Sequence, residues 1–315
     1  MVTVSVVVRT YNSGQVIANC FDSLFRQTSK DYEVIVIDGG SVDETLEIVK
    51  KYPAKVLHDS PGRNPCNLGI EAAQGRIVAF LDDDCVAPAG WVNDIFLSFK
   101  NDEVAAVGGP ELAPPRSEYW PRCFDAVRQL EKKFLLRWGP VEQLCTCNIA
   151  YKKDVLSRVG GFADWLFAGE ETELNWRLFR GGWRLLFNPE LGVYHNRRTS
   201  LRRYLAQQIN TGLGAGRMLR MHPSFFKPSH LGLIALLGTF AITAWLLIAR
   251  RFDTVEQLTI FLSVVVTLTS MYGGFIAKEA KLIPGIILAS ILLAAARCIG
   301  FIGGLAMPLK RIRYR

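Results

Sequence analysis

Three consecutive acids, Asp82, Asp83 and Asp84, follow the apolar run RIVAFL and are the residues of this sequence best suited to chemistry. Carboxylates at positions i and i+2 just beyond a buried strand can converge on one divalent cation, and such hard oxygen ligands suit Mg²⁺ or Mn²⁺. The alternative is a turn or a helix cap, because Asp is common at both. Like charges this close repel unless a cation compensates them, which favours a metal site.

A second acidic motif, DGGSVDET, begins at Asp38 and again links an apolar run to a helical segment. Ser41 or Asp43 is expected to cap the following helix. Asp38 stands where a strand ends, and its carboxylate could accept hydrogen bonds from a nucleobase N–H or a ribose hydroxyl. The residue types of this motif predict helix capping. A ligand-binding role for Asp38 is inferred only from its position at the end of a strand.

A third acidic motif opens with Glu170 and Glu171 at the start of a predicted helix. Acids at a helix N-terminus are favoured by the helix dipole, and a general base is the functional alternative. Glu173 and Arg177 are four residues apart and are expected to form a surface ion pair.

Among the four histidines, His195 follows the strand-like run LGVYH and is the one placed to join a metal site. Other motifs fail. The glycines of GLGAG (residues 212–216) follow no predicted strand, and the sequence contains no GxxxxGK[ST], HExxH or GxSxG motif.

The first 110 residues alternate β-rich and helical segments, which predicts an α/β fold with a mostly parallel sheet and helices on both faces. The predicted strands cover residues 2–8, 32–38, 54–58 and 76–82, and the predicted helices cover 15–27, 43–52, 64–74 and 90–100. In such sheets the ligand site lies beyond the carboxyl ends of the strands. Thr10, Asp38 and Asp82 all stand at such ends.

Three parts are expected along the chain. Residues 1–110 form the α/β half, and residues 111–228 form an α+β part that ends in an amphipathic helix at 198–222. That helix either lies flat on a bilayer or is a solvated surface helix. Residues 229–315 form a membrane region.

Composition supports this division. The chain has 315 residues, of which 50% are hydrophobic and 21% charged, which excludes a disordered chain. Residues 229–315 hold nine Lys and Arg against three Asp and Glu, so the basic excess belongs to an apolar tail and points to a membrane surface. The remainder is almost neutral, and nucleic acid is therefore not expected as a partner.

The tail contains three apolar segments, at 231–249, 258–277 and 282–306, each near the length that crosses a bilayer. The third contains Arg297, and a break near residues 284–285 would make it re-entrant, leaving two spans rather than three. A multi-pass protein of the cell membrane with a cytoplasmic catalytic domain is expected. The seven cysteines form no CxxC pair, which favours reduced thiols facing the cytosol.

Five segments in this order resemble the family 2 inverting glycosyltransferases. They are VSVVVRTYNSG, VIDGGSVDET, PGRNPCNLGIEAAQGRIVAFLDDD, CNIAYKKDVLSRVGGF and GEETELNWRLFRGGWRLLFNPELGVYH. The resemblance covers residues 2–195, and the apolar tail is similar to that of the membrane-anchored subgroup that builds polysaccharides or lipid-linked glycans. It implies a GT-A fold, a nucleotide-diphosphate sugar donor, a divalent cation (Mg²⁺ or Mn²⁺), and a lipid-linked or polysaccharide acceptor.

The resemblance also implies roles for individual residues. Donor binding falls to Thr10, Tyr11, Asp38, Arg63, Asn67, Asp82 and Asp83, and the cation falls to Asp84, Asp82 and His195. Glu171 stands where the family usually has the Asp of its Glu-Asp pair, so the general base is Glu171 or its neighbour Glu170. Gly39 replaces a second Asp of the nucleoside motif. The QxxRW signature is absent, which predicts transfer of one sugar per acceptor encounter.

Two alternatives stay open from sequence. A polyprenyl-phosphate sugar synthase would use an acceptor that is already ionised and scarcely needs a base. A non-catalytic, membrane-bound sugar-binding scaffold would explain the Asp-to-Glu change and Gly39, although the intact acidic cluster at 82–84 argues against it.

Overall fold

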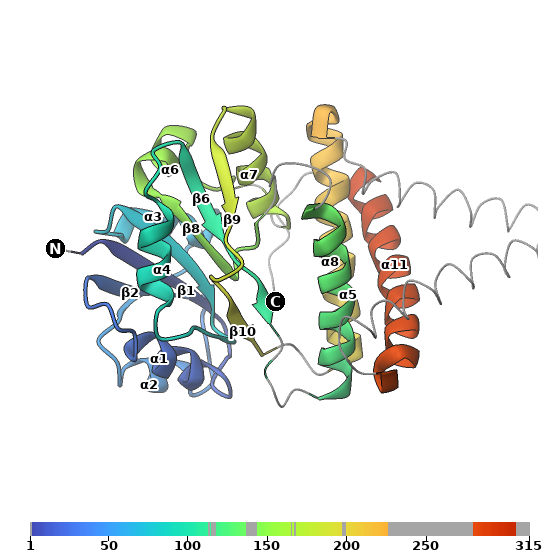
Figure 1. Cartoon of the computed structure of the whole chain (residues 1–315), viewed down its shortest axis with the longest axis horizontal. Helices are drawn as coiled ribbons and strands as arrows, with labels where there is room; N and C mark the ends of the chain where they lie inside the picture. The colour runs from blue at the N-terminus through green and yellow to red at the C-terminus, as the bar shows by residue number, and fades with distance from the viewer. Residues whose placement is uncertain are drawn as a thin grey trace, which may run out of the picture. The chain divides into compact units, whose positions relative to one another are not determined.

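The computed structural model describes residues 2–112, 114, 118–136, 144–164, 166, 168–196, 200–225 and 280–306. These residues form two compact units. The first unit holds two sheets and the helices around them, and the second is helical (Figure 1). The part expected over residues 111–228 contributes to both units, because its strands join the first and two of its helices join the second.

The main sheet of the first unit has seven strands in the order β3-β2-β1-β4-β8-β6-β9, and a smaller sheet has the order β5-β10-β7. Within the main sheet β8 runs antiparallel to its neighbours and the other pairings are parallel. The strands are β1 (Val4–Thr10), β2 (Tyr32–Asp38), β3 (Lys55–His58), β4 (Ile77–Asp82), β5 (Cys85–Val86), β6 (Val104–Gly108), β7 (Glu111–Leu112), β8 (Asn148–Lys152), β9 (Arg184–Phe187) and β10 (Val193–His195). The mostly parallel α/β sheet is confirmed.

The central strand β1 carries a continuous apolar run because both of its faces are covered. All of its residues except Arg9 are buried, as expected for a parallel strand between two helical layers. β1 pairs with β2 on one side and with β4 on the other, and the register places Arg9 opposite Asp82. β2 and β3 thus lie on one side of β1, and β4 lies on the other side. Open α/β sheets bind ligands at such a switch in strand order.

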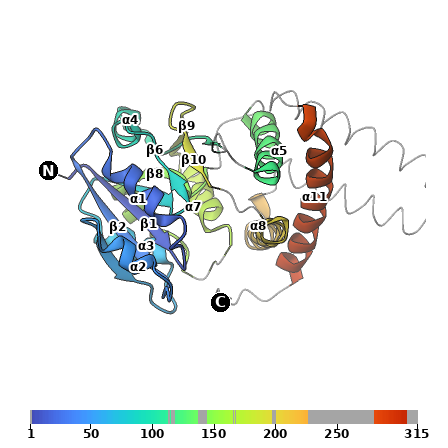
Figure 2. The ribbon, with the colours of Figure 1, turned by 90° about the horizontal axis from the view of Figure 1, so that it is seen from below.

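Helices cover both faces of the main sheet (Figures 1 and 2). One core cluster holds apolar residues of α1, α2 and α4, and the other holds those of α3, α6 and α7. The helices are α1 (Ile17–Phe25), α2 (Thr45–Val49), α3 (Pro65–Ala72), α4 (Trp91–Ser98), α6 (Lys153–Val159) and α7 (Glu170–Arg180).

The described residues of the second unit form three long helices that pack around a core with stacked aromatic rings. They are α5 (Tyr119–Leu136), α8 (Leu201–Met221) and α11 (Ile283–Ala306), with short 3₁₀ helices at Pro223–Phe225 and Ala280–Leu282. The rings of Phe124 and Tyr204 stack with centroids 3.9 Å apart. The helices α8 and α11 approach closely, since a Cβ on Gly300 would lie 1.9 Å from the carbonyl oxygen of Ile209.

In the part of the chain that the structure describes, residues 280–306 form one helix long and apolar enough to cross a membrane. The helix α11 runs without a break past Pro284, which stands in its first turn, where a missing N–H costs nothing. Arg297 donates a hydrogen bond from Nε to Gln208 Oε1 at 2.6 Å. The expected spans at 231–249 and 258–277 lie outside the described residues.

Asn148, the first residue of β8, joins three parts of the first unit. Its Oδ1 accepts a hydrogen bond from Trp91 Nε1 at 2.9 Å. Its Nδ2 donates to the carbonyl oxygens of Leu191 at 2.6 Å and Pro110 at 3.4 Å. The side chain therefore ties α4 and the segments before β7 and β10 to the main sheet.

Replacing this amide tests its contribution. Asn148→Ala leaves the buried Trp91 N–H and two carbonyls without their partner, so it should lower the free energy of unfolding by about 1–3 kcal/mol. Urea denaturation measures the change. Asn93→Ala, on the exposed side of α4, is the matched control and should stay within about 0.5 kcal/mol. Equal losses in the two variants would contradict the role of Asn148.

Candidate active site

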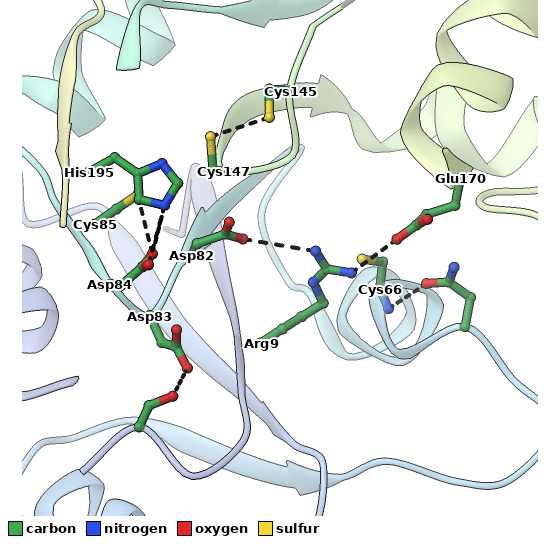
Figure 3. A network of polar contacts seen from close by, with 12 residues as sticks. Arg9, Cys66, Asp82, Asp83, Asp84, Cys85, Cys145, Cys147, Glu170 and His195 are labelled. Carbon is green, nitrogen blue, oxygen red and sulfur yellow. Dashed lines mark hydrogen bonds and ion pairs between the residues drawn. The ribbon is translucent and has the colours of Figure 1, made fainter. Parts of the chain in front are cut away.

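The acidic turn after β4 holds three carboxylates with three different partners (Figure 3). Asp82 Oδ1 lies 3.8 Å from Arg9 Nη2. Asp83 accepts a hydrogen bond from the hydroxyl of Ser13, and burial raises its pKa to about 6. Asp84 Oδ1 lies 3.1 Å from His195 Nε2. Each of the three neighbouring carboxylates therefore contacts a different side chain.

The pairing of Asp84 with His195 is made by the smaller sheet. β10 pairs antiparallel with β5, and this register sets His195 opposite Cys85, the residue after Asp84. One ligand atom from each of Asp84, Cys85 and His195 lies within 4.8 Å of the others. A carboxylate, an imidazole and a thiol at this separation form a donor set that fits a divalent cation.

His195 is more than nine-tenths buried, and its Nδ1 finds no hydrogen-bond partner among the residues that the structure describes. This unsatisfied atom is uncommon in a buried side chain and marks the residue as more than packing. The structure brings together two of the three expected metal ligands, Asp84 and His195. The third, Asp82, lies beside Arg9 instead, and its role at a cation stays a prediction.

Arg9 links the acidic turn after β4 to the start of α7. It is not among the site residues predicted from the sequence. Its Nη1 lies 3.3 Å from Glu170 Oε1, while its Nη2 faces Asp82. The sequence does contain a hint of its role, because Arg9 is the one cation in the apolar run VSVVVRT. Its two partners are far from it in the sequence, so only the fold could identify them.

The two acids at the start of α7 differ in environment. Glu170 meets Arg9, as described above. Burial and the charge of Glu170 raise the pKa of Glu171 to about 7, against a smaller opposing effect of Arg9. A carboxylate with this pKa exchanges protons near neutral pH, which is what a general base requires.

The position of α7 is fixed by its own buried residues. Gly169 precedes the helix with φ 82°, a left-handed conformation that favours glycine. Tyr151 donates a hydrogen bond from its hydroxyl to Asn175 Oδ1 at 2.9 Å, and Asn175 Nδ2 donates to the Leu144 carbonyl at 3.0 Å. These contacts hold the middle of α7 to β8 and to the segment before it.

The pairing of Glu173 with Arg177 was expected at the surface, and this expectation is wrong. Arg177 Nε lies 2.6 Å from Glu173 Oε1, but Glu173 is buried. Arg177 also donates to the carbonyl oxygens of Val159 and Gly161. The pair is drawn away from the surface because the Arg177 guanidinium also reaches the end of α6 and the turn after it, and it therefore fastens α7 to α6.

The end of β2 combines a turn with an exposed aromatic residue. The Asp38 carboxylate accepts hydrogen bonds from the backbone N–H groups of Gly40 at 3.0 Å and Ser41 at 3.1 Å. Of the two residues expected to cap the next helix, Asp43 accepts a hydrogen bond from the Thr45 N–H at 3.1 Å, whereas the N-cap residue of α2 is Glu44, whose side chain makes no cap hydrogen bond. Thr10, at the end of β1, is buried, whereas Tyr11 is 52% exposed. Nucleoside binding by Thr10, Tyr11 and Asp38 stays a prediction.

Two other expected donor-binding residues have structural partners. Asn67 in α3 donates from Nδ2 to the Phe162 carbonyl at 2.8 Å and accepts from the Phe162 N–H at 2.9 Å. Arg63 forms a two-point ion pair with Glu71 at the surface. The Asn67 amide is thus occupied by the main chain, and donor contacts from Arg63 and Asn67 stay predictions.

Comparison with known proteins shows which family this chain resembles. Residues 5–160 match the family model described as glycosyl transferase family 2. The chain is 27% identical over 256 residues to glycosyltransferase AglE of Haloferax volcanii, covering 78% of this chain and 80% of that protein. It is 26% identical over 257 residues to the pre-mycofactocin glycosyltransferase of Mycobacterium tuberculosis, of which it spans about half (52%).

Among solved structures, a mannosyltransferase from Pyrobaculum calidifontis in complex with GDP-Man and Mn²⁺ superposes with a TM-score of 0.65. The two chains are 19% identical, and the match covers 96% of this chain and 87% of the other. This likeness shows the fold, which is the expected GT-A fold. Residues 5–160 place the chain in glycosyl transferase family 2. The protein is a glycosyltransferase.

The contact between Arg9 and the acidic helix gives a first prediction for this site. Arg9→Met removes a positive charge that lowers the pKa of Glu171, so the pKa should rise further above 7. A carboxyl-carbon NMR titration measures it. Arg26→Met, at an exposed arginine paired with Asp22, is the control and should leave the titration unchanged. A downward or absent shift in Arg9→Met would show that Arg9 does not act on Glu171.

Proposed function

We propose that the protein transfers a sugar from a nucleotide-diphosphate sugar to a hydroxyl group of a membrane-associated, lipid-linked or polysaccharide acceptor, with inversion at the anomeric carbon. The observation that carries this proposal is the arrangement at the carboxyl ends of β1 and β4. A carboxylate with a pKa near 7, Glu171, neighbours Glu170, which Arg9 connects to the acidic turn. The proposed base and the proposed cation ligands therefore come from residues at one edge of the sheet.

The reaction is a single displacement. The acceptor oxygen forms a bond to the anomeric carbon while the bond from that carbon to the diphosphate oxygen breaks, and Glu171 takes the hydroxyl proton. A positioned base of this kind contributes about 10²–10⁴-fold. One displacement inverts the configuration, so no covalent glycosyl-enzyme forms.

Asp84 and His195 are the residues proposed to hold a divalent cation. Such a cation, when bound, neutralises negative charge on a diphosphate leaving group. An imidazole ligand favours Mn²⁺ over Mg²⁺, because Mg²⁺ is bound mainly by carboxylates, phosphates and water.

The membrane-associated acceptor is proposed from the C-terminal helix. Residues 280–306 are long and apolar enough to span a bilayer, and α11 exposes Ile291, Ile299 and Ile302. An enzyme anchored in this way meets acceptors that share the same membrane. The proposed location is the cell membrane, with the catalytic unit in the cytoplasm.

The base assignment is tested by Glu171→Gln. The variant cannot accept the proton, so turnover should fall about 10²–10⁴-fold while donor affinity, measured by calorimetry, is retained. Wild-type turnover should rise with pH through about 7 as the Glu171 carboxyl loses its proton, and this step should disappear in the variant.

Glu47→Gln, at an exposed position in α2, is the matched control and should keep wild-type turnover. If Glu171→Gln stays close to wild type and Glu170→Gln loses activity instead, Glu170 is the base.

The cation ligands are tested by Asp84→Asn. Removal of a direct ligand should weaken Mn²⁺ binding at least about tenfold, as measured by electron paramagnetic resonance of the free ion. Asp83→Asn is the control, because its carboxylate is engaged by Ser13, and its affinity for Mn²⁺ should change less. Equal affinities in Asp84→Asn and the wild type would remove Asp84 from the cation site.

The alternative of a polyprenyl-phosphate sugar synthase makes a different prediction. An acceptor phosphate is already ionised, so the double variant Glu170→Gln/Glu171→Gln would keep its activity toward that acceptor. The present proposal expects the double variant to be inactive toward hydroxyl acceptors and the wild type to show no transfer to a polyprenyl phosphate. Radiolabelled sugar transfer to the two acceptor types distinguishes these outcomes.

A further inference from the structure

A second cluster of metal-ligating side chains lies beside the candidate active site and has no part in the proposed reaction. Cys145 and Cys147 stand in the segment before β8, with their sulfur atoms 3.3 Å apart (Figure 3). The carboxylate of Glu111, in β7, and these two sulfurs lie within 4.8 Å of one another. Cys147 and Glu111 are buried, and Cys145 is partly exposed.

These three side chains supply a recognisable donor set. Two sulfurs and one carboxylate oxygen, from β7 and the segment before β8, lie close enough together to bind a single cation. Such donors suit a tetrahedral, thiophilic cation such as Zn²⁺, with water as the fourth ligand. Cys85, in β5, belongs to the other group of ligating side chains, with Asp84 and His195.

The surrounding structure holds these groups in place. Asn148 follows Cys147 directly and bonds to the carbonyl oxygen of Pro110, the residue before Glu111. Asn175 bonds to the carbonyl of Leu144, the residue before Cys145. Both ends of the Cys-Thr-Cys segment are thus tied to neighbouring elements, which reduces the entropy lost when a cation is bound.

Buried cysteines are usually small apolar packing residues, and this is the alternative reading of the cluster. Glu111 argues against it, because its side chain belongs to a residue only 3% exposed and yet lies against two sulfurs. A carboxylate and two thiols in contact are ligand types that thiophilic divalent cations take in proteins.

We propose that Cys145, Cys147 and Glu111 form a binding site for a thiophilic divalent cation of the Zn²⁺ and Cd²⁺ class. The site is distinct from the cation position at Asp84 and His195. Binding releases the thiol protons to solvent, and each sulfur then donates an electron pair to the cation. The bound cation joins β7 to the segment before β8, and β7 pairs with β10, the strand that carries His195.

The test uses the full-length, reduced protein titrated with Cd²⁺ in the presence of excess Mg²⁺. Thiolate-to-cadmium charge transfer in the ultraviolet should appear with one equivalent and should be accompanied by a rise in the thermal midpoint. Both signals should vanish in Cys145→Ser/Cys147→Ser, and Cd²⁺ affinity should fall at least about tenfold in Glu111→Gln. Circular dichroism confirms that each variant is folded.

Two controls separate this site from others. Cys298→Ser, at a buried cysteine of α11, should leave the absorption unchanged. His195→Ala should leave it largely intact, whereas a site at Asp84, Cys85 and His195 would lose it. Cadmium NMR of the wild type counts the sulfur ligands without any substitution, and a shift typical of two sulfurs is expected. One sulfur, no absorption, or absorption that survives in the double variant would overturn the proposal.

Discussion

Carboxylates that gather at one edge of a buried sheet repel one another, and the candidate active site depends on how that repulsion is balanced. Arg9 stands between Asp82 and Glu170, Ser13 donates to Asp83, and His195 faces Asp84. Because each acid meets a different neighbour, the acids can occupy one small region without sharing an environment. The same arrangement leaves Asp84 and His195 facing each other as possible cation ligands.

The pKa of Glu171 follows from this arrangement. Burial and the negative charge of Glu170 raise it, and the positive charge of Arg9 opposes the rise. The site thus contains a carboxylate suited to proton exchange near neutral pH and carboxylates held by polar partners, which is a common division of roles between acids in enzymes. The tertiary contacts of α7, through Asn175 and the Glu173–Arg177 pair, keep this division stable.

The smaller sheet carries residues of both clusters of metal-ligating side chains, the one at Asp84 and His195 and the one at Glu111, Cys145 and Cys147. Its central strand β10 carries His195, and its flanking strands carry Cys85 and Glu111. These strands are only two or three residues long, so they are not stable alone and depend on contacts such as those of Asn148.

Local sequence was sufficient for the features that depend on local physics. Valine-rich runs predicted buried parallel strands, and the acids after them were correctly expected at the carboxyl ends, because hydrophobic periodicity is a property of neighbouring residues. The order of five motifs was enough to indicate the family. Tertiary structure decided the rest. Several contacts join residues that are distant in sequence. They are the contacts of Arg9 with Asp82 and Glu170, of Asp84 with His195, of Asn67 with Phe162, and of Glu111 with Cys145 and Cys147. Such contacts depend on strand order and register, which no local pattern specifies.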